Sequence, residues 1–200
     1  MGLDKKYIIP LVSTLCVIAI VLPIVLVVPQ QASDQGVEDA FVDKIEASVN
    51  QGVLVGQLTP EAGMFLGIPF SQPPVADWRW RNPRDPVNFP GGQWDATYTR
   101  PACPQICDQP ASEYSCPHET NEDCLYLNVW VPRRLATKVS GNSVIEDNHY
   151  MLDTQSGQSL AVMVWFYGGN FLNGAGSCVL YDGRFMSNLG DVIIVTTNYR

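Results

Sequence analysis

The sequence predicts an α/β domain with a mixed central sheet, a short N-terminal β hairpin and few helices, preceded by one transmembrane helix. Tyr7–Val28 is a long apolar run without a charge, as in a membrane span. Apolar runs of strand length follow at Leu125–Val131, Leu160–Phe166 and Val192–Thr197, and the β-branched composition of the last is typical of a strand buried on both faces. Pro69–Pro104 is dense in Pro, Gly and Trp, which predicts ordered loops rather than helices.

Length and charge narrow the classes of protein. The chain has 200 residues, of which 46% are hydrophobic, and this is enough for one domain with a core. The formal net charge is −8. An acidic balance of this kind argues against a nucleic-acid partner, because binding to phosphates requires clustered basic residues.

The apolar run at Tyr7–Val28 has the dimensions of a membrane span. Its 22 residues would extend about 33 Å as a helix, close to a hydrocarbon core of about 30 Å. Lys5 and Lys6 precede it, so residues 1–6 are predicted to be cytosolic, residues 7–28 to form a signal-anchor, and the rest to be extracellular or lumenal. Cleavage as a signal peptide near Ala32, followed by secretion, is the alternative.

The next segments are predicted from turn and strand signals. Residues 29–48 are polar and are interpreted as a linker. Gly52–Leu58 and Met64–Ile68 predict a hairpin, since the turn-forming Thr59–Gly63 separates them. Arg133–Ser159 is polar and without periodicity, which indicates an exposed insertion between strands.

Four cysteines cluster in one loop-rich stretch. Cys103, Cys107, Cys116 and Cys124 lie in a region for which a non-cytosolic location permits oxidation, so two disulfides are expected. Zinc is a weaker interpretation, because three residues separate Cys103 from Cys107 and structural zinc sites favour closer pairs. Spacing alone leaves all three pairings open, and Cys178 remains outside the cluster.

The segment with most chemical content is Val164–Gly174, in which a hydrophobic strand runs into a glycine-rich turn. Glycine permits tight bending and close approach of a ligand to backbone N–H groups, and such amides can hold an anion. An ordinary strand-to-loop turn is the alternative. The sequence contains neither nucleotide fingerprint, G-x-G-x-x-G or G-x-x-x-x-G-K-[ST], and we expect no cofactor and no metal.

A family resemblance emerges from several motifs that occur in order. Glu122–Pro132 (EDCLYLNVWVP) resembles the type-B carboxylesterase signature without a mismatch, and Phe65–Phe70, Cys103–Gln105, Tyr181–Arg184 and Asn198–Arg200 resemble other parts of the same family. The chain is therefore similar to the cholinesterase and type-B carboxylesterase family. The resemblance implies that residues 49–200 are the N-terminal portion of an α/β-hydrolase fold.

The resemblance also implies roles for the glycine-rich turn. The family's oxyanion donors correspond to the backbone amides of Gly169 and Asn170, with Gly168 allowing the turn. Asn170 stands where the family often has glycine or alanine, and asparagine tolerates unusual backbone angles better than most residues. The serine, acidic residue and histidine of the family's triad have no counterpart here, and no G-x-S-x-G pentapeptide occurs. We expect the domain to be truncated before the nucleophile and the 200-residue chain to be inactive.

The family pattern further pairs Cys103 with Cys124 and leaves Cys107 with Cys116 as an inner bridge. In cholinesterases the loop closed by the first bridge carries a tryptophan that stacks on choline. No tryptophan lies between Cys103 and Cys124, and Tyr114 is nearest to that place. A phenol ring attracts a cation less strongly than indole, so choline specificity is not expected.

Two functions follow from the resemblance. The first is a membrane-anchored carboxylic ester hydrolase that acts on a small-molecule ester and contacts the membrane through residues 7–28. The second is a non-catalytic cell-surface adhesion protein, neurotactin-like or neuroligin-like, with a protein partner, because a fold does not imply a function.

The topology of the chain can be tested directly. A tag inserted after Asp34 should be fully protected from protease added to sealed vesicles, because the basic residues before the apolar run retain the N-terminus in the cytosol. A tag at the N-terminus serves as the accessible control. Cleavage of the Asp34 tag from the cytosolic side would contradict the predicted orientation.

Overall fold

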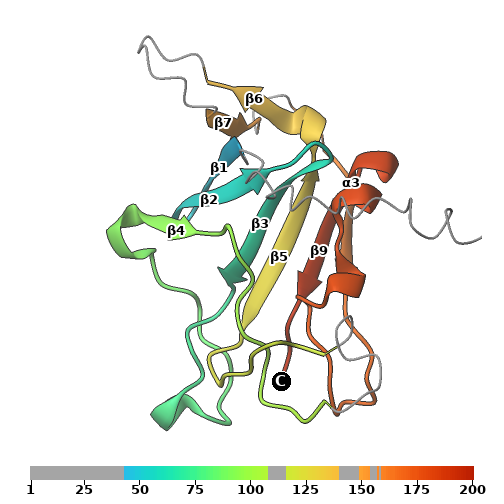
Figure 1. Cartoon of the computed structure of the whole chain (residues 1–200). Helices are drawn as coiled ribbons and strands as arrows, with labels where there is room; N and C mark the ends of the chain where they lie inside the picture. The colour runs from blue at the N-terminus through green and yellow to red at the C-terminus, as the bar shows by residue number, and fades with distance from the viewer. Residues whose placement is uncertain (1–42, 108–115, 140–148, 154–156, 158) are drawn as a thin grey trace, which may run out of the picture. The chain divides into compact units, whose positions relative to one another are not determined.

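A mixed β-sheet organises the described part of the chain (Figure 1). The computed structural model describes residues 43–107, 116–139, 149–153, 157 and 159–200, all within one unit that spans Phe41–Arg200. The strands are β1 (Asp43–Val49), β2 (Gly52–Leu58), β3 (Ala62–Pro69), β4 (Gln93–Asp95), β5 (Tyr126–Pro132), β6 (Ala136–Lys138), β7 (His149–Leu152), β8 (Val162–Trp165) and β9 (Ile193–Thr197).

The sheet has the spatial order β6-β7-β1-β2-β3-β5-β9-β8, and β4 pairs with β2 beside this path. Adjacent strands along the central path β1-β2-β3-β5-β9 are antiparallel. Three other pairs are parallel: β7 with β1, β4 with β2, and β8 with β9. The mixed sheet expected from the sequence is therefore confirmed.

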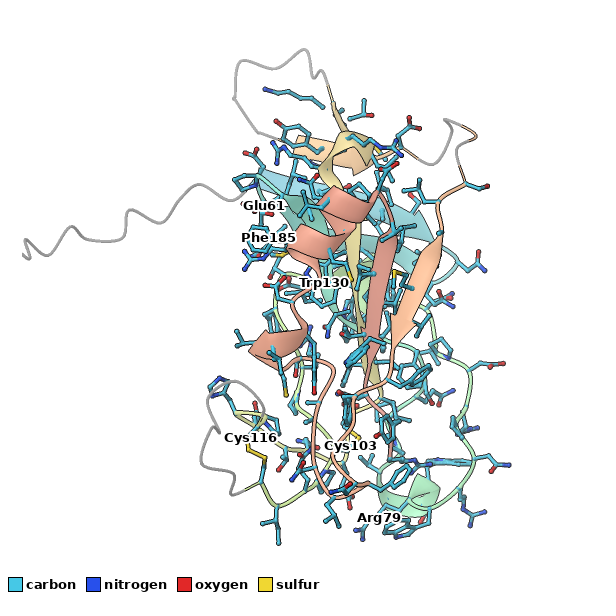
Figure 2. All side chains as sticks on the ribbon, turned by 90° about the vertical axis from the view of Figure 1, so that its right-hand side faces the viewer. Glu61, Arg79, Cys103, Cys116, Trp130 and Phe185 are labelled. Carbon is cyan, nitrogen blue, oxygen red and sulfur yellow. A yellow bond between two sulfur atoms is a disulfide. The ribbon has the colours of Figure 1, made fainter. Side chains whose placement is uncertain are left out.

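Helical structure is scarce in the residues that the structure describes, as the sequence predicted. They contain one α-helix, α3 (Arg184–Gly190), and four 3₁₀ turns: η1 (Ala76–Trp78), η2 (Pro90–Gly92), η3 (Arg133–Leu135) and η4 (Val179–Tyr181). Helix α3 packs against β5 and β3. The ring of Trp130, labelled in Figure 2, lies close to Gly183 at the start of this helix and is 5% exposed.

The predicted hairpin and three of the predicted strands are confirmed. Strands β2 and β3 pair antiparallel, and the turn between them closes when the Thr59 N–H donates to the Ala62 carbonyl at 2.9 Å. The ends of strands β5, β8 and β9 differ from the ends of the predicted apolar runs by at most two residues. The hairpin turn is shorter than expected, because β3 begins at Ala62.

Two segments that were predicted to lack structure contribute strands. Strand β1 occupies Asp43–Val49, at the end of the stretch interpreted as a linker, and buries Ile45 completely against the core. Within the predicted insertion Arg133–Ser159, strands β6 and β7 extend the sheet beyond β1. Both strands lie in stretches rich in polar residues, so composition did not reveal them.

The burial predicted for Val192–Thr197 is partly wrong. Strand β9 alternates, with Ile194 and Thr196 buried between half-buried neighbours, rather than being buried on both faces. Strand β8 lies at the edge of the sheet, and its four side chains are 48% to 56% exposed. Their apolar composition reflects a strand type that is usually covered on both sides, but the described residues cover neither face of β8.

The predicted cytosolic residues 1–6, the predicted span 7–28 and residues 29–42 of the predicted linker lie outside the described residues. In the part that the structure does describe, no helix has the length and apolar character needed to cross a membrane.

The correction at β1 leads to a stability prediction. Ile45→Ala should lower the free energy of unfolding by about 2–5 kcal/mol, the usual cost of emptying a fully buried aliphatic site. Urea unfolding of the purified chain measures the change. Lys44→Ala, an exposed neighbour on the same strand, is the control and should change stability by less than about 0.5 kcal/mol. If Ile45→Ala changed the free energy of unfolding as little as Lys44→Ala does, residues 43–48 would act as a linker after all.

Candidate functional site

The glycine-rich turn begins where β8 ends, at a buried tyrosine. The Tyr167 ring stacks on the Tyr199 ring with 4.5 Å between centroids, and the Tyr199 hydroxyl donates to the Tyr167 carbonyl at 2.9 Å. The Tyr167 hydroxyl in turn donates to the Tyr199 carbonyl at 3.4 Å. Burial raises the pKa of Tyr167, so its phenol stays protonated and able to donate. These contacts fasten the start of the turn to the chain that follows β9.

Of the adjacent glycines Gly168 and Gly169, only the second has to be glycine. Gly169 has a φ of 139°, and a Cβ atom on it would lie 2.0 Å from the Asn173 carbonyl oxygen. The Leu172 N–H closes the turn by donating to the Gly169 carbonyl at 2.9 Å. Gly168 was predicted to allow the turn, but a Cβ atom there would meet nothing within 4 Å. The steric demand for glycine therefore falls on Gly169.

The next two residues adopt left-handed backbone angles. Asn170 has a φ of 54° and Phe171 a φ of 60°, a region that asparagine enters far more readily than a bulky residue does. The Phe171 side chain is 94% exposed. Strained backbone of this kind persists only where its surroundings impose it, and it is concentrated at ligand sites.

The two predicted oxyanion donors lie within this turn. Among the described residues, the backbone N–H groups of Gly169 and Asn170 have no hydrogen-bond acceptor. Asn170 is exposed and Gly169 is half-buried, so a bound ligand could approach both. Unpaired backbone donors that a ligand can reach are suited to an anion or a developing negative charge.

Polar side chains hold the residues that follow the turn. The Gly176 N–H donates to Asn198 Oδ1 at 2.9 Å, and its carbonyl accepts from Asn128 Nδ2 at 3.3 Å and from Thr196 Oγ1 at 2.7 Å. Gln105 hydrogen-bonds to both backbone groups of Gly174. None of these four side chains was identified from the sequence as part of the site, although Gln105, Asn128 and Asn198 belong to motifs that carry the family resemblance.

Both disulfides implied by the resemblance are confirmed. Cys103 and Cys124 are joined, with a sequence separation of 21, and Cys107 and Cys116 form the inner bridge, with a separation of 9. Figure 2 shows Cys103 at the same end of the unit as Arg79, and Cys116 apart from both. Tyr114, which was considered as a cation-binding ring, lies outside the described residues.

Among the described cysteines, Cys178 lies outside the cluster; it is buried and forms no disulfide with the other four. Burial raises the pKa of its thiol, so the neutral thiol predominates at neutral pH. For the part of the chain that is described, no group of three or more His, Cys, Asp or Glu side chains is arranged to hold a metal ion.

A cavity of about 590 Å³ lies against the turn. The turn contributes Tyr167, Phe171, Leu172, Asn173 and Gly174 to its wall. The rest of the lining includes the exposed side chain of Trp80, both cysteines of the Cys103–Cys124 disulfide, and Arg79 and Glu122, which form an ion pair with 2.5 Å between Nε and Oε1. Its volume suits a small organic ligand.

Comparison with known proteins agrees with this arrangement. A sequence profile described as the carboxylesterase family matches residues 43–200. The chain belongs to the carboxylesterase family. The first residue of that match coincides with the start of β1, which again places this strand inside the domain.

Individual relatives include both esterases and a cholinesterase. The carboxylesterase chain is 40% identical over 144 residues to the para-nitrobenzyl esterase of Bacillus subtilis (strain 168), a match that covers 71% of this chain and 25% of that protein. It is 34% identical over 137 residues to acetylcholinesterase-1 of Trittame loki, which covers 68% of this chain and 21% of the relative.

A solved structure described as a thermophilic PNB esterase superimposes with a TM-score of 0.61 at 36% identity, over 78% of this chain and 28% of that one. The chain thus spans between a fifth and a third of the length of these relatives, and the mixed sheet with few helices is the corresponding portion of a known esterase fold.

The disulfides can be tested by mapping and by removal. Peptide mass mapping of the oxidised chain should show Cys103 linked to Cys124 and Cys107 linked to Cys116. The double variant Cys103→Ser, Cys124→Ser should lose about 3 kcal/mol of unfolding free energy in the chain-entropy treatment of a loop of this length. A peptide linking Cys103 to Cys107, or four free thiols, would contradict the assignment.

Proposed function

We propose that the chain forms the N-terminal part of a membrane-anchored carboxylic ester hydrolase, in which the backbone amides of Gly169 and Asn170 bind the oxyanion. One observation carries the proposal. The two amides have no acceptor among the described residues, and they lie in a strained turn after β8 whose next residues, Phe171 to Gly174, line a cavity of about 590 Å³.

The chemistry of ester hydrolysis explains why such donors are useful. When a serine hydroxyl attacks an ester carbonyl, negative charge moves onto the carbonyl oxygen of the tetrahedral intermediate. Donors held in place before the reaction stabilise that charge without having to reorganise. A backbone N–H serves better than a mobile side chain here, because the turn fixes its direction.

The relatives support an ester as the substrate class. The para-nitrobenzyl esterase and the thermophilic esterase are named as esterases, and both match more than two thirds of this chain at 36% identity or more. We therefore propose a small-molecule carboxylic ester as substrate. The membrane anchor at residues 7–28 and the extracellular or lumenal location remain part of the proposal and rest on the sequence alone.

The nucleophile is the decisive missing element of this proposal. The 200 residues contain no G-x-S-x-G sequence, so a hydrolase would need a serine elbow elsewhere in its polypeptide. Sequencing the transcript past the Arg200 codon tests this. A serine elbow within about 100 codons favours the hydrolase by the usual order of these motifs. A coding sequence that continues without serine, acid and histidine of the triad would favour the adhesion function instead.

Two substitutions in the turn test the role of the backbone amides in the form of the protein that hydrolyses p-nitrophenyl esters. Gly169→Val should lower kcat by about 100-fold, equivalent to about 3 kcal/mol of transition-state stabilisation, because the side chain would collide with the Asn173 carbonyl and displace a donor. Asn170→Gly should keep kcat within about 3-fold, since it retains the N–H. Both are measured at equal folded concentration.

Gly190→Val is the matched control, because a Cβ atom at Gly190 meets only the Val192 side chain, at 3.4 Å and 4.0 Å. An unchanged kcat in Gly169→Val would show that the turn is an ordinary loop. A large loss in Asn170→Gly would show that the asparagine side chain is itself the donor.

A further inference from the structure

The side chain of Gln105 connects the disulfide-bonded loop to the glycine-rich turn, across 69 positions of sequence. Its Oε1 accepts from the Gly174 N–H at 2.6 Å, and its Nε2 donates to the Gly174 carbonyl at 2.7 Å. The same Nε2 donates to the Cys103 carbonyl at 3.1 Å. One amide group therefore satisfies both backbone groups of Gly174, as a neighbouring strand would.

Gly174 has little freedom to find other partners. It is buried and has a φ of 121°, and a Cβ atom on it would lie 2.4 Å from the Tyr167 ring. A buried backbone N–H or carbonyl without a partner is costly, so the Gln105 contacts should determine where Gly174 lies.

The position of Gly174 is transmitted to the candidate donors through the adjacent residue. The Asn173 N–H donates to the Gly169 carbonyl at 3.3 Å, and the Asn173 carbonyl is the group that excludes a side chain at Gly169. A shift of Gly174 would therefore move Asn173 against Gly169 and change the direction of the Gly169 and Asn170 amides.

The other end of the connection is rigid. Cys103 is 7% exposed and is joined to Cys124, which is 1% exposed. The Cys124 carbonyl accepts from Asn198 Nδ2 at 3.0 Å, close to the end of β9. The disulfide thus holds the segment that carries Gln105 against the sheet.

We propose that Gln105 is a positioning residue for the oxyanion turn, which couples the fixed Cys103–Cys124 disulfide to the Gly169 and Asn170 amides. The catalytic part of this statement rests on the proposed function, whereas the coupling between Gln105 and the turn can be measured without any activity. If Gln105 stabilised only its own loop, its loss would leave the amides of Leu172 and Asn173 unaffected.

The Gln105→Glu variant provides a test within one folded protein. A protonated carboxyl group has one acceptor and one donor, so it can replace both contacts to Gly174, whereas the ionised carboxylate only accepts and would repel the Gly174 carbonyl. Amide hydrogen exchange of the full 200-residue chain, followed by NMR and corrected for intrinsic rates, reports the protection of Leu172, Asn173 and Gly174.

The expected results differ with pH. In Gln105→Glu, protection of these three amides should be close to wild type near pH 4 and about 10-fold lower near pH 7, by loss of one buried hydrogen bond. In Gln105→Leu the protection of these amides should be about 10-fold lower than in the wild type at both pH values. In the wild type the protection should not depend on pH. Unchanged protection in both variants would overturn the proposal.

A matched control and an activity measurement separate this proposal from the proposed function. Gln72→Leu removes an amide that donates to the Asp85 carbonyl at 3.1 Å in another loop, and it should leave the turn protected. Val129 in β5 should keep its protection in every variant, as a sign of intact folding. In the ester-hydrolysing form, Gln105→Leu should lower kcat about 10-fold with KM within about 2-fold, because donor placement matters most in the transition state.

The two proposals can fail separately. If Gly169→Val abolishes catalysis but Gln105→Leu leaves kcat intact, Gln105 is not a positioning residue and the oxyanion assignment stands. If the exchange results hold but no form of the protein hydrolyses esters, the coupling through Gln105 stands and the hydrolase function is wrong.

Discussion

The buried backbone at Gly176 forms its hydrogen bonds with side chains of the sheet rather than with another strand. These hydrogen bonds determine where the glycine-rich turn lies. The loop around Gly176, which follows the turn, lies against β5 and β9 but does not pair with them as a strand. Buried backbone groups must nevertheless be satisfied. Asn128, Thr196 and Asn198, which are 5%, 1% and 4% exposed, supply the missing donors and acceptors from the sheet.

The same side chains link this loop to distant parts of the domain. Asn128 also accepts from the Gly67 N–H at 2.9 Å, and Asn198 also donates to the carbonyls of Pro101 and Cys124. A fully satisfied polar network of this kind specifies one arrangement, because any shift leaves a buried group unpaired. The strained angles at Gly169, Asn170 and Phe171 can persist because both ends of the turn are held: Tyr167 by Tyr199, and Gly174 by Gln105.

The edge of the sheet at β8 contrasts with this well-satisfied region. Its side chains are apolar on both faces and about half exposed, and Phe185, Met186 and Leu189 of α3 are also exposed. Parallel strands are normally covered on both faces. The relatives that share this fold are about three times as long as this chain, because matches over 78% and 68% of it cover only 28% and 21% of theirs.

The sequence by itself determined the features that depend on local composition and on motifs. Apolar runs located β5, β8 and β9, turn residues located the hairpin, and the Glu122–Pro132 motif identified the family. Local preferences are sufficient there, because strand propensity and turn chemistry are properties of short segments. The resemblance also assigned the disulfide pairing, which spacing alone had left open.

Only the tertiary structure decided which polar segments join the sheet and which side chains hold the turn. Asp43–Val49 resembles a linker until β2 and β7 pair with it on either side. Gln105, Asn128 and Asn198 resemble ordinary polar residues, because their function lies in hydrogen bonds to glycines between 22 and 69 positions away. The path of the folded chain sets such contacts, and no local pattern of the sequence encodes them. The exposure of β8 was also decided at this level, since burial depends on what packs against a strand and not on its composition.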